Sequence, residues 1–266
     1  MSRIAIVSAM TEELGRLHEH LDPGALCERH GGRDFWVGRM DGRDVVIVLS
    51  RIGKVAAATT ATLLASHFDV SALVFTGAAG GIGPHVQVGD VVVATGLLQH
   101  DMDASPIFPR FEVPLYGTDR FAADIALSSA VATAVADALA PDAPHATDGL
   151  RPALAALAAA RAAAGLPPHQ PRLHQGLVLS GDCFVSSRAQ CDQLLAWHPE
   201  ALAVEMEGAA LAQVCADFGL PFAVVRTISD RADDQAHVDF PRFIAETASR
   251  YTLAIVSGWL KGPGGR

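Results

Sequence analysis

The sequence predicts an α/β fold, in which a mixed central sheet lies between two layers of helices as a three-layer α/β/α sandwich. Apolar segments of strand length alternate with helical segments along the whole chain. Half of the 266 residues are hydrophobic and only 18% are charged, which suits buried strands covered by Ala-rich helices. A chain of this length can form one α/β domain, so we expect residues 1–266 to fold as a single domain.

The first half of the chain opens with a strand, a loop and a helix. Arg3–Ser8 is the apolar strand, and the helix runs from about Glu12 to His20 with Thr11 as its N-cap. Asp41-Gly42 is a turn dipeptide and predicts a hairpin. The other predicted elements of this half are the hairpin strands Phe35–Met40 and Asp44–Ser50, the helix Lys54–His67, the strand Ala72–Thr76 before a glycine-rich turn, and the segment Val86–Ala94, a turn that leads into a β-rich run.

The second half contains two unusual segments. Gln99–Tyr116 carries prolines and aromatics without a clear period, so we expect a structured loop. Residues 141–171 are rich in alanine, with high helix propensity but little bulk, and predict a peripheral helix flanked by flexible joints. The remaining predicted elements are the strands Gly176–Ser180, Leu202–Glu205 and Phe222–Ile228 and the helices Gly208–Phe218 and Pro241–Leu260.

Charge and cysteine content exclude several classes of function. The formal net charge is −9 and no basic run is present, which argues against binding to nucleic acid or to an anionic membrane. The four cysteines are scattered without a CxxC pair, so neither a zinc knuckle nor a disulfide framework is expected. The amino terminus lacks a signal-peptide pattern and no segment reaches 18 apolar residues, so we expect a cytoplasmic protein.

Acidic residues follow several of the predicted strands. Glu12 and Glu13 follow the first strand, Glu205 and Glu207 lie at the end of another, and Asp230 follows the strand Phe222–Ile228. Ligand sites of open α/β sheets lie at the carboxyl ends of the strands, so these acids are candidates for one site. Each acid alone would also serve as a helix cap, a first-turn acid or a turn residue.

Together these acids are the residue types that cleavage of a purine N-glycosidic bond requires. The bond breaks through an oxocarbenium-like state, in which one acid protonates the leaving base, one activates water and one holds a ribose hydroxyl. An apolar, partly closed site would raise the pKa of the acid that donates its proton.

Several motifs, in order along nearly the whole chain, resemble those of the 5′-methylthioadenosine/S-adenosylhomocysteine nucleosidases of the nucleoside phosphorylase superfamily. This resemblance implies a nucleoside phosphorylase-like fold and hydrolytic release of adenine from these nucleosides, with 5′-deoxyadenosine a further candidate, without cofactor or metal. The motifs are Ala9–Glu13, Ser50–Val55, Thr76–Gly81, Ser180–Val185, Val204–Ala209 and Arg226–Asp233.

The resemblance also implies roles for single residues. Glu13 would handle the catalytic water, while Asp230, steadied by Ser229, would pass a proton to adenine N7. Phe184 would stack on adenine. Without the motif around it, the same residue would be interpreted as an ordinary aromatic of the core. The other implied substrate contacts are Val185 with the adenine edge, Glu207 with the ribose hydroxyls, Met206 with the sugar, Met10 and Ile52 with the thio-substituted end, and Ala79, Gly80, Glu205, Arg226 and Phe240 as further lining.

The segment Gln99–Tyr116 carries two further expectations. Its Phe108 and Pro114 stand where the family uses a neighbouring subunit to cover the substrate tail, which implies a homodimer. His100, Asp101 and Asp103 have side chains that bind metals, but on an irregular loop such residues are more often solvated or capping, and we predict no metal site.

Three alternatives stay open. A nucleoside phosphorylase shares the fold but must hold a phosphate dianion. Glu12 and Glu13 disfavour that anion, whereas Arg51 keeps the alternative open. A nucleosidase for another adenine nucleoside, such as a futalosine-type compound, and a non-catalytic nucleoside-binding protein are the other two. Apart from these alternatives, Ala78 is a departure from the family pattern, which often has a small hydroxyl residue at this position.

Overall fold

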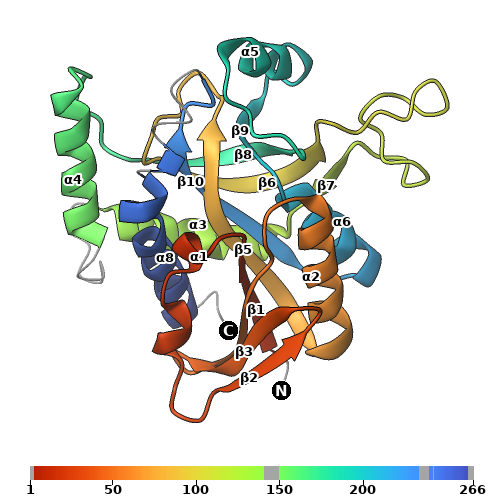
Figure 1. Cartoon of the computed structure of the whole chain (residues 1–266), viewed down its shortest axis with the longest axis vertical. Coiled ribbons are helices and arrows are strands. Elements are labelled where there is room, and N and C mark those ends of the chain that lie inside the picture. The colour runs from red at the N-terminus through yellow and green to blue at the C-terminus, as the bar shows by residue number, and fades with distance from the viewer. Residues whose placement is uncertain (1–2, 141–149, 234–239, 242, 263–266) are drawn as a thin grey trace.

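The computed structural model describes residues 3–140, 150–233, 240, 241 and 243–262 (Figure 1). Its strands form one mixed sheet in the order β10-β6-β8-β9-β5-β1-β4-β3-β2, with β7 paired to β6. The predicted α/β class is therefore confirmed. The strands are β1 Arg3–Ser8, β2 Leu26–His30, β3 Arg33–Met40, β4 Arg43–Leu49, β5 Val70–Gly81, β6 Val91–Gln99, β7 Arg120–Ala122, β8 Leu173–Ser180, β9 Ala201–Glu205 and β10 Phe222–Asp230.

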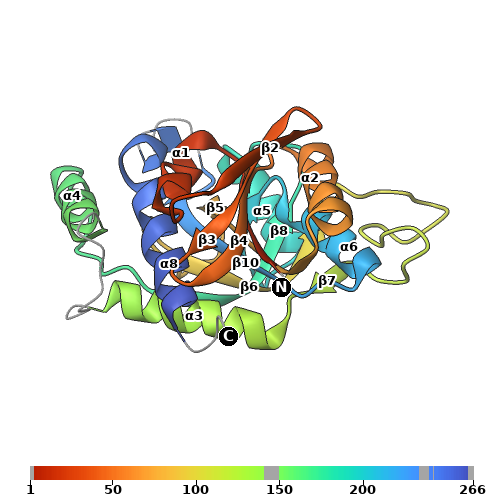
Figure 2. The same ribbon diagram turned by 90° about the horizontal axis from the view of Figure 1, so that it is seen from below.

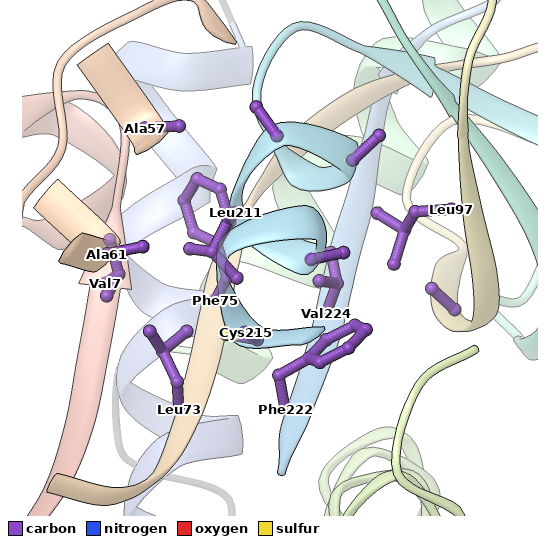
Figure 3. Packing of buried hydrophobic residues seen from close by; sticks show 14 of the residues in the cluster. Val7, Ala57, Ala61, Leu73, Phe75, Leu97, Leu211, Cys215, Phe222 and Val224 are labelled. Atoms are coloured by element: carbon purple, nitrogen blue, oxygen red, sulfur yellow. The ribbon is translucent and has the colours of Figure 1, made fainter. Parts of the chain in front are cut away.

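Helices cover both faces of the sheet, as a three-layer sandwich requires (Figures 1 and 2). One apolar core lies between the sheet and the helices α2 and α6, and Figure 3 shows Ala57 and Leu211 from these helices close to Phe75 and Val224 from the strands. A second core joins the opposite face to α3 and α8. The helices are α1 Thr11–Leu14, η1 Leu17–His20, α2 Lys54–His67, α3 Ile125–Leu139, α4 Leu150–Ala163, α5 Arg188–Trp197, α6 Gly208–Phe218, η2 Ile244–Ala248 and α8 Ser249–Lys261.

Part of the sheet closes on itself through the glycine-rich segment. The segment Thr76–Gly81 is the end of strand β5, which corrects the predicted turn. It pairs in parallel with β10 and, at Gly80 and Gly81, in antiparallel with β9, so that β5, β10, β6, β8 and β9 form a ring. A Cβ atom on Gly80 would lie 2.9 Å from the Ala232 side chain, so glycine allows the backbone to approach this residue closely.

The first and last helices differ from their predicted forms. The predicted helix from Glu12 to His20 is broken after Leu14, because Gly15 has φ +55° and packs directly against Ser249. Its N-cap is Met10 and not Thr11. The predicted helix from Pro241 is confirmed at Pro241 and Phe243, but Ile244–Ala248 forms a π-helical turn before the helix continues into α8.

The alanine-rich segment forms a peripheral helix, as predicted, which stands at the edge of the molecule (Figure 1). Residues 141–149 of the predicted insertion and of its flexible joint lie outside the described part of the chain. Leu150 and Ala153 of α4 are buried, and Leu150 belongs to the second core. No helix in the described ranges is long and apolar enough to span a membrane.

Candidate active site

A cavity of about 270 Å³ lies at the carboxyl ends of β1, β5, β9 and β10. Segments that are far apart in sequence therefore meet there, as we predicted from the acids that follow the strands. Cys183, which the sequence did not single out, also contributes to the wall. The predicted site residues that line the cavity are Met10, Glu13, Ile52, Ala79, Gly80, Phe184, Val185, Glu205, Met206, Glu207, Asp230 and Phe240.

Glu13 is held at the cavity wall by backbone amides. Its Oε2 accepts hydrogen bonds from the N–H groups of Ala9 (3.0 Å) and Met10 (2.9 Å), and its Oε1 accepts one from Ala78 (2.8 Å). Burial raises the pKa of Glu13, and the charge of Arg226 and the three amides only partly oppose this. The result is a fixed carboxylate with increased proton affinity, which suits a general base. The amide of Ala78 makes its bond whatever side chain it carries.

Asp230 ends strand β10 and is also almost completely buried. Its Oδ1 accepts a hydrogen bond from the Ala232 N–H at 2.8 Å, and its Oδ2 accepts one from the Ser229 hydroxyl at 2.8 Å. Ser229 is not among the described residues that line the cavity, so it contacts Asp230 from behind. The two bonds fix the direction in which the carboxyl group can exchange a proton.

Glu205 forms a buried ion pair with Arg226. Its carboxylate accepts hydrogen bonds from Arg226 Nη2 (2.7 Å), from the N–H of Gly208 (2.9 Å) and from the hydroxyl of Ser180. Arg226 is 1% exposed, with its guanidinium 4.1 Å from the centre of the Phe75 ring. It is absent from the described lining of the cavity, so the structure gives it the contacts of a structural ion-pair partner.

Glu207 is the fourth buried acid that lines the cavity. Burial, followed by the charge of Glu205, raises the pKa of Glu207 to about 8, although the charge of Arg226 opposes the shift. Its Oε1 accepts a hydrogen bond from the Gly53 N–H at 2.8 Å. Sequence reasoning missed this role of Gly53, although a glycine directly before a helix, here at φ +97°, is a usable signal.

Replacing Glu207 by Gln is expected to raise the melting temperature by several degrees above pH 8 and to change it little at pH 5. The raised pKa means that the stability linked to the protonated group is fully present below pH 4.5 and is lost as the pH rises through about 8. Glutamine cannot ionise and still accepts the bond from Gly53. Melting curves at pH 5, 7 and 8.5 test this, with the exposed Glu19→Gln as control. An equal shift at all three pH values would contradict it.

The aromatic side of the cavity is formed by Phe184 and Phe240. Their ring centroids lie 5.5 Å apart at an interplanar angle of 66°. Phe184 is 43% exposed, so part of its ring is free to stack on a planar ligand, while the neighbouring Val185 is buried.

An ionic network that the sequence did not predict joins the loops around the cavity. Lys54 Nζ lies 2.6 Å from Asp101 Oδ1, Asp101 Oδ2 accepts a bond from the Asp182 N–H, and Asp182 Oδ1 accepts one from the Lys54 N–H. Burial raises the pKa of Asp101, but the bonds from Lys54 and Asp182 outweigh burial and leave it below its usual range. The network ties the start of α2 to the loop that carries Phe184.

Asp103 and His100 are two further polar residues of the 99–116 segment. Asp103 accepts hydrogen bonds from the backbone and side chain of Ser105, and His100 is buried with no hydrogen-bond partner at Nε2 among the described residues. In the described ranges, no three His, Cys, Asp or Glu side chains are grouped so as to hold a metal ion.

Phe108 and Pro114 do not contact the cavity of their own chain. They belong to the segment between β6 and β7, which projects from the body of the molecule as a loop (Figures 1 and 2). The neighbouring Ile107 and Leu115 are 83% and 91% exposed.

The charges of the cavity wall decide which ligands it can accept. Four carboxyl groups, those of Glu13, Glu205, Glu207 and Asp230, line it, whereas its described lining includes no Lys or Arg. Arg51, which kept the phosphorylase alternative open, lines a neighbouring cavity instead. The arrangement favours proton transfer and hydroxyl binding and disfavours a phosphate dianion.

Comparison with known proteins shows the family to which the chain belongs. The family model of the phosphorylase superfamily matches residues 3–261. The chain is 35% identical over 256 residues to a 5′-methylthioadenosine/S-adenosylhomocysteine nucleosidase of Chromohalobacter salexigens, covering 96% of this chain and 95% of the relative.

Solved structures of nucleosidases also resemble the chain along its length. One is the 5′-methylthioadenosine/S-adenosylhomocysteine nucleosidase of Neisseria meningitidis with methylthio-immucillin-A, with a TM-score of 0.80, 31% identity and coverage of 98% and 99% of the two chains. Another is the Colwellia psychrerythraea enzyme with adenine, with a TM-score of 0.78, 29% identity and coverage of 98% and 95%.

Proposed function

Because the chain belongs to the phosphorylase superfamily, and within it to the 5′-methylthioadenosine/S-adenosylhomocysteine nucleosidases, we propose that it hydrolyses these two nucleosides and releases adenine. The observation that carries the proposal is the pair of buried acids, Glu13 and Asp230, on the wall of one cavity without a lining cation among the described residues.

The two acids divide the proton transfers of the reaction. Protonated Asp230 donates its proton to N7 of adenine, which lets the bond between C1′ and N9 break with its electron pair on the base. Water attacks the oxocarbenium-like C1′ and gives a proton to Glu13, whose raised pKa favours accepting it. The products are free adenine and a thio-substituted ribose.

The other residues of the cavity hold the nucleoside. Glu207 accepts hydrogen bonds from the ribose hydroxyls, and Met206 packs against the sugar. The exposed part of the Phe184 ring stacks on adenine, while the backbone of Val185 reads the edge of the base. Arg226 and Ser229 act from behind the wall, on Glu205 and Asp230.

Phosphorolysis fits this cavity poorly. A phosphate dianion at about 4 Å from a carboxylate would meet a repulsion of about 2 to 8 kcal/mol, depending on the local dielectric. Neither a guanidinium nor an ammonium group of the described lining offsets this repulsion. Water carries no such charge.

Adenine release is the direct test of the proposed activity. The purified protein should liberate adenine from 5′-methylthioadenosine and from S-adenosylhomocysteine, as followed by chromatography. Inosine serves as the control, since it lacks the adenine amino group. Release of hypoxanthine from inosine without release of adenine from the other two would overturn the proposal.

A homodimer would complete the site. The projecting loop offers apolar side chains at Ile107, Phe108 and Leu115, and the rim of the cavity offers Ile52, which is 54% exposed. Contact between these surfaces in two copies would bury the apolar side chains and cover the 5′ end of the substrate. The cytoplasmic location and a part in methionine salvage stay predictions.

Replacing Phe108 by Ala is expected to raise KM for 5′-methylthioadenosine about tenfold, because a covering apolar side chain is lost from the partner's site. Steady-state kinetics together with sedimentation at several protein concentrations measure the effect. Ile125→Ala, at an exposed position on α3, is the control. An unchanged KM would remove Phe108 from the lid.

A further inference from the structure

A second cavity of about 570 Å³ adjoins the catalytic cavity. The two share Ala9, Met10 and Ile52, so they meet at the side where the 5′ substituent of the substrate is expected. The second cavity lies between the α1–η1 segment and the ends of β3 and β4. The catalytic reaction described above uses none of its remaining lining.

Two guanidinium groups lie on the wall of this second cavity. Arg33 is buried and donates to the carbonyls of Gly31 and Ala56, whereas Arg51 is exposed and donates one bond, from Nη2 to the Gly32 carbonyl at 2.5 Å. In the described ranges, neither has a carboxylate within 4 Å. Burial lowers the pKa of Arg33, and so does electrostatic repulsion from the positive charge of Arg51.

The same wall carries negative charge and an aromatic surface. Asp34 and Glu12 line the cavity, and among the described residues Asp34 pairs only with the exposed Arg29, at 3.7 Å. The rings of His18 and Trp36 stack with centroids 4.7 Å apart and also line it. Cations, carboxylates and an apolar surface within one hollow suit a ligand with both charges on a short aliphatic chain.

Arg51 has an unusual backbone conformation. Its φ is +70°, in the left-handed region that glycine adopts freely and that a side chain makes unfavourable. Gly53, two residues later in the same turn, also has a positive φ. Strained residues that are not glycine cluster at ligand sites, which is a reason to ask what the Arg51 side chain binds.

We propose that the second cavity binds the α-amino-acid end of the 5′ substituent, with Arg51 contacting its carboxylate and Asp34 or Glu12 its ammonium group. This inference rests on the proposed nucleosidase function and names the substrate class that its 5′ side recognises. The homocysteinyl group of S-adenosylhomocysteine has this chemistry, whereas the methylthio group of 5′-methylthioadenosine ends in an uncharged methyl.

The test compares kcat/KM for the two nucleosides. Arg51→Met keeps the length of the side chain but removes its charge, and should lower the ratio of kcat/KM for S-adenosylhomocysteine to that for 5′-methylthioadenosine about tenfold. The matched control is Arg39→Met, because Arg39 is exposed and lines neither cavity. This control should leave both values within twofold of the wild type.

A third nucleoside separates the carboxylate from the rest of the tail. Adenosine with a 5′-(3-aminopropyl)thio group lacks only the carboxylate of S-adenosylhomocysteine. The wild-type enzyme should use it about tenfold less well than S-adenosylhomocysteine, and Arg51→Met should not lower its kcat/KM further. An equal loss for both nucleosides in the variant would overturn the proposed contact.

Arg51→Gly distinguishes binding from a structural role. Glycine adopts a positive φ without strain, so the melting temperature of this variant should rise above that of the wild type. The ratio of kcat/KM for S-adenosylhomocysteine to that for 5′-methylthioadenosine should fall as in Arg51→Met. A ratio that stays within twofold of the wild-type value in both variants would overturn the inference and leave the nucleosidase function standing. If the wild-type protein cleaved neither nucleoside, the proposed function would fail, and the inference with it.

Discussion

Asp230→Asn is expected to lower kcat for 5′-methylthioadenosine about a thousandfold while binding of the nucleoside stays within a few-fold of the wild type. Loss of a general acid typically costs 10² to 10⁴ in rate. An amide of the same shape can accept the hydrogen bond from Ala232 and can donate to the Ser229 hydroxyl, so the cavity should keep its form. The amide cannot donate a proton to N7 in the way that a carboxyl group does.

Single-turnover adenine release and calorimetric titration of the variant separate the two effects. Asp192→Asn makes the same chemical change at an exposed position on α5 and is the control. A variant that kept kcat within tenfold of the wild type would remove Asp230 from the mechanism. Loss of binding together with loss of rate would instead assign Asp230 to holding the base.

Glu13→Gln is expected to lower kcat by about a thousandfold for a different reason. The amide cannot take a proton from water, so attack on C1′ loses its base. The carboxylate also accepts three backbone N–H groups, and an amide has only one oxygen with which to accept them. At least one N–H would face the amide nitrogen, at a cost of about 1–3 kcal/mol that relief of the buried charge partly offsets.

Because of that cost, the rate of Glu13→Gln must be measured on a protein shown to be folded. The increase in melting temperature on adding adenine reports an intact cavity, and kcat is then measured at the same temperature. Glu13→Asp, which keeps the charge on a shorter side chain, should retain more activity than Glu13→Gln. A Glu13→Gln variant with an adenine response and a kcat within tenfold of the wild type would exclude water activation by this residue.

The cavity tolerates four neighbouring carboxyl groups because each has a different environment. Glu205 is paired with Arg226, whereas burial and the charge of Glu205 raise the pKa of Glu207 to about 8. Glu13 and Asp230 are fixed by amide and hydroxyl donors. Different environments give similar side chains separate roles, as the chemistry of glycosidic cleavage requires.

The positions of the acids were predictable because they depend on the strands. Hydrophobic runs identified β1, β9 and β10, and the ends of such strands share one edge of the sheet. The helix α6 was also predicted with its observed ends, Gly208 and Phe218. The sequence therefore predicts those parts of the site that lie on buried, strongly patterned elements or directly after them.

The parts that sequence missed depend on contacts between distant residues. The pairing of β5 with β9 at Gly80 and Gly81 joins segments over 120 residues apart, and no local pattern signals it. The apolar helix α3 escaped prediction because its many buried small residues give no clear polar face. The contact between Arg226 and Glu205, and the second cavity beside Ile52, also required the assembled fold.

The most direct test of the central claim is adenine release from 5′-methylthioadenosine in phosphate-free buffer and again with added phosphate, with the sugar product identified by mass. A cavity lined by carboxylates predicts equal rates in both buffers and free methylthioribose as the product. Strict dependence on phosphate, with a sugar 1-phosphate as the product, would contradict the account.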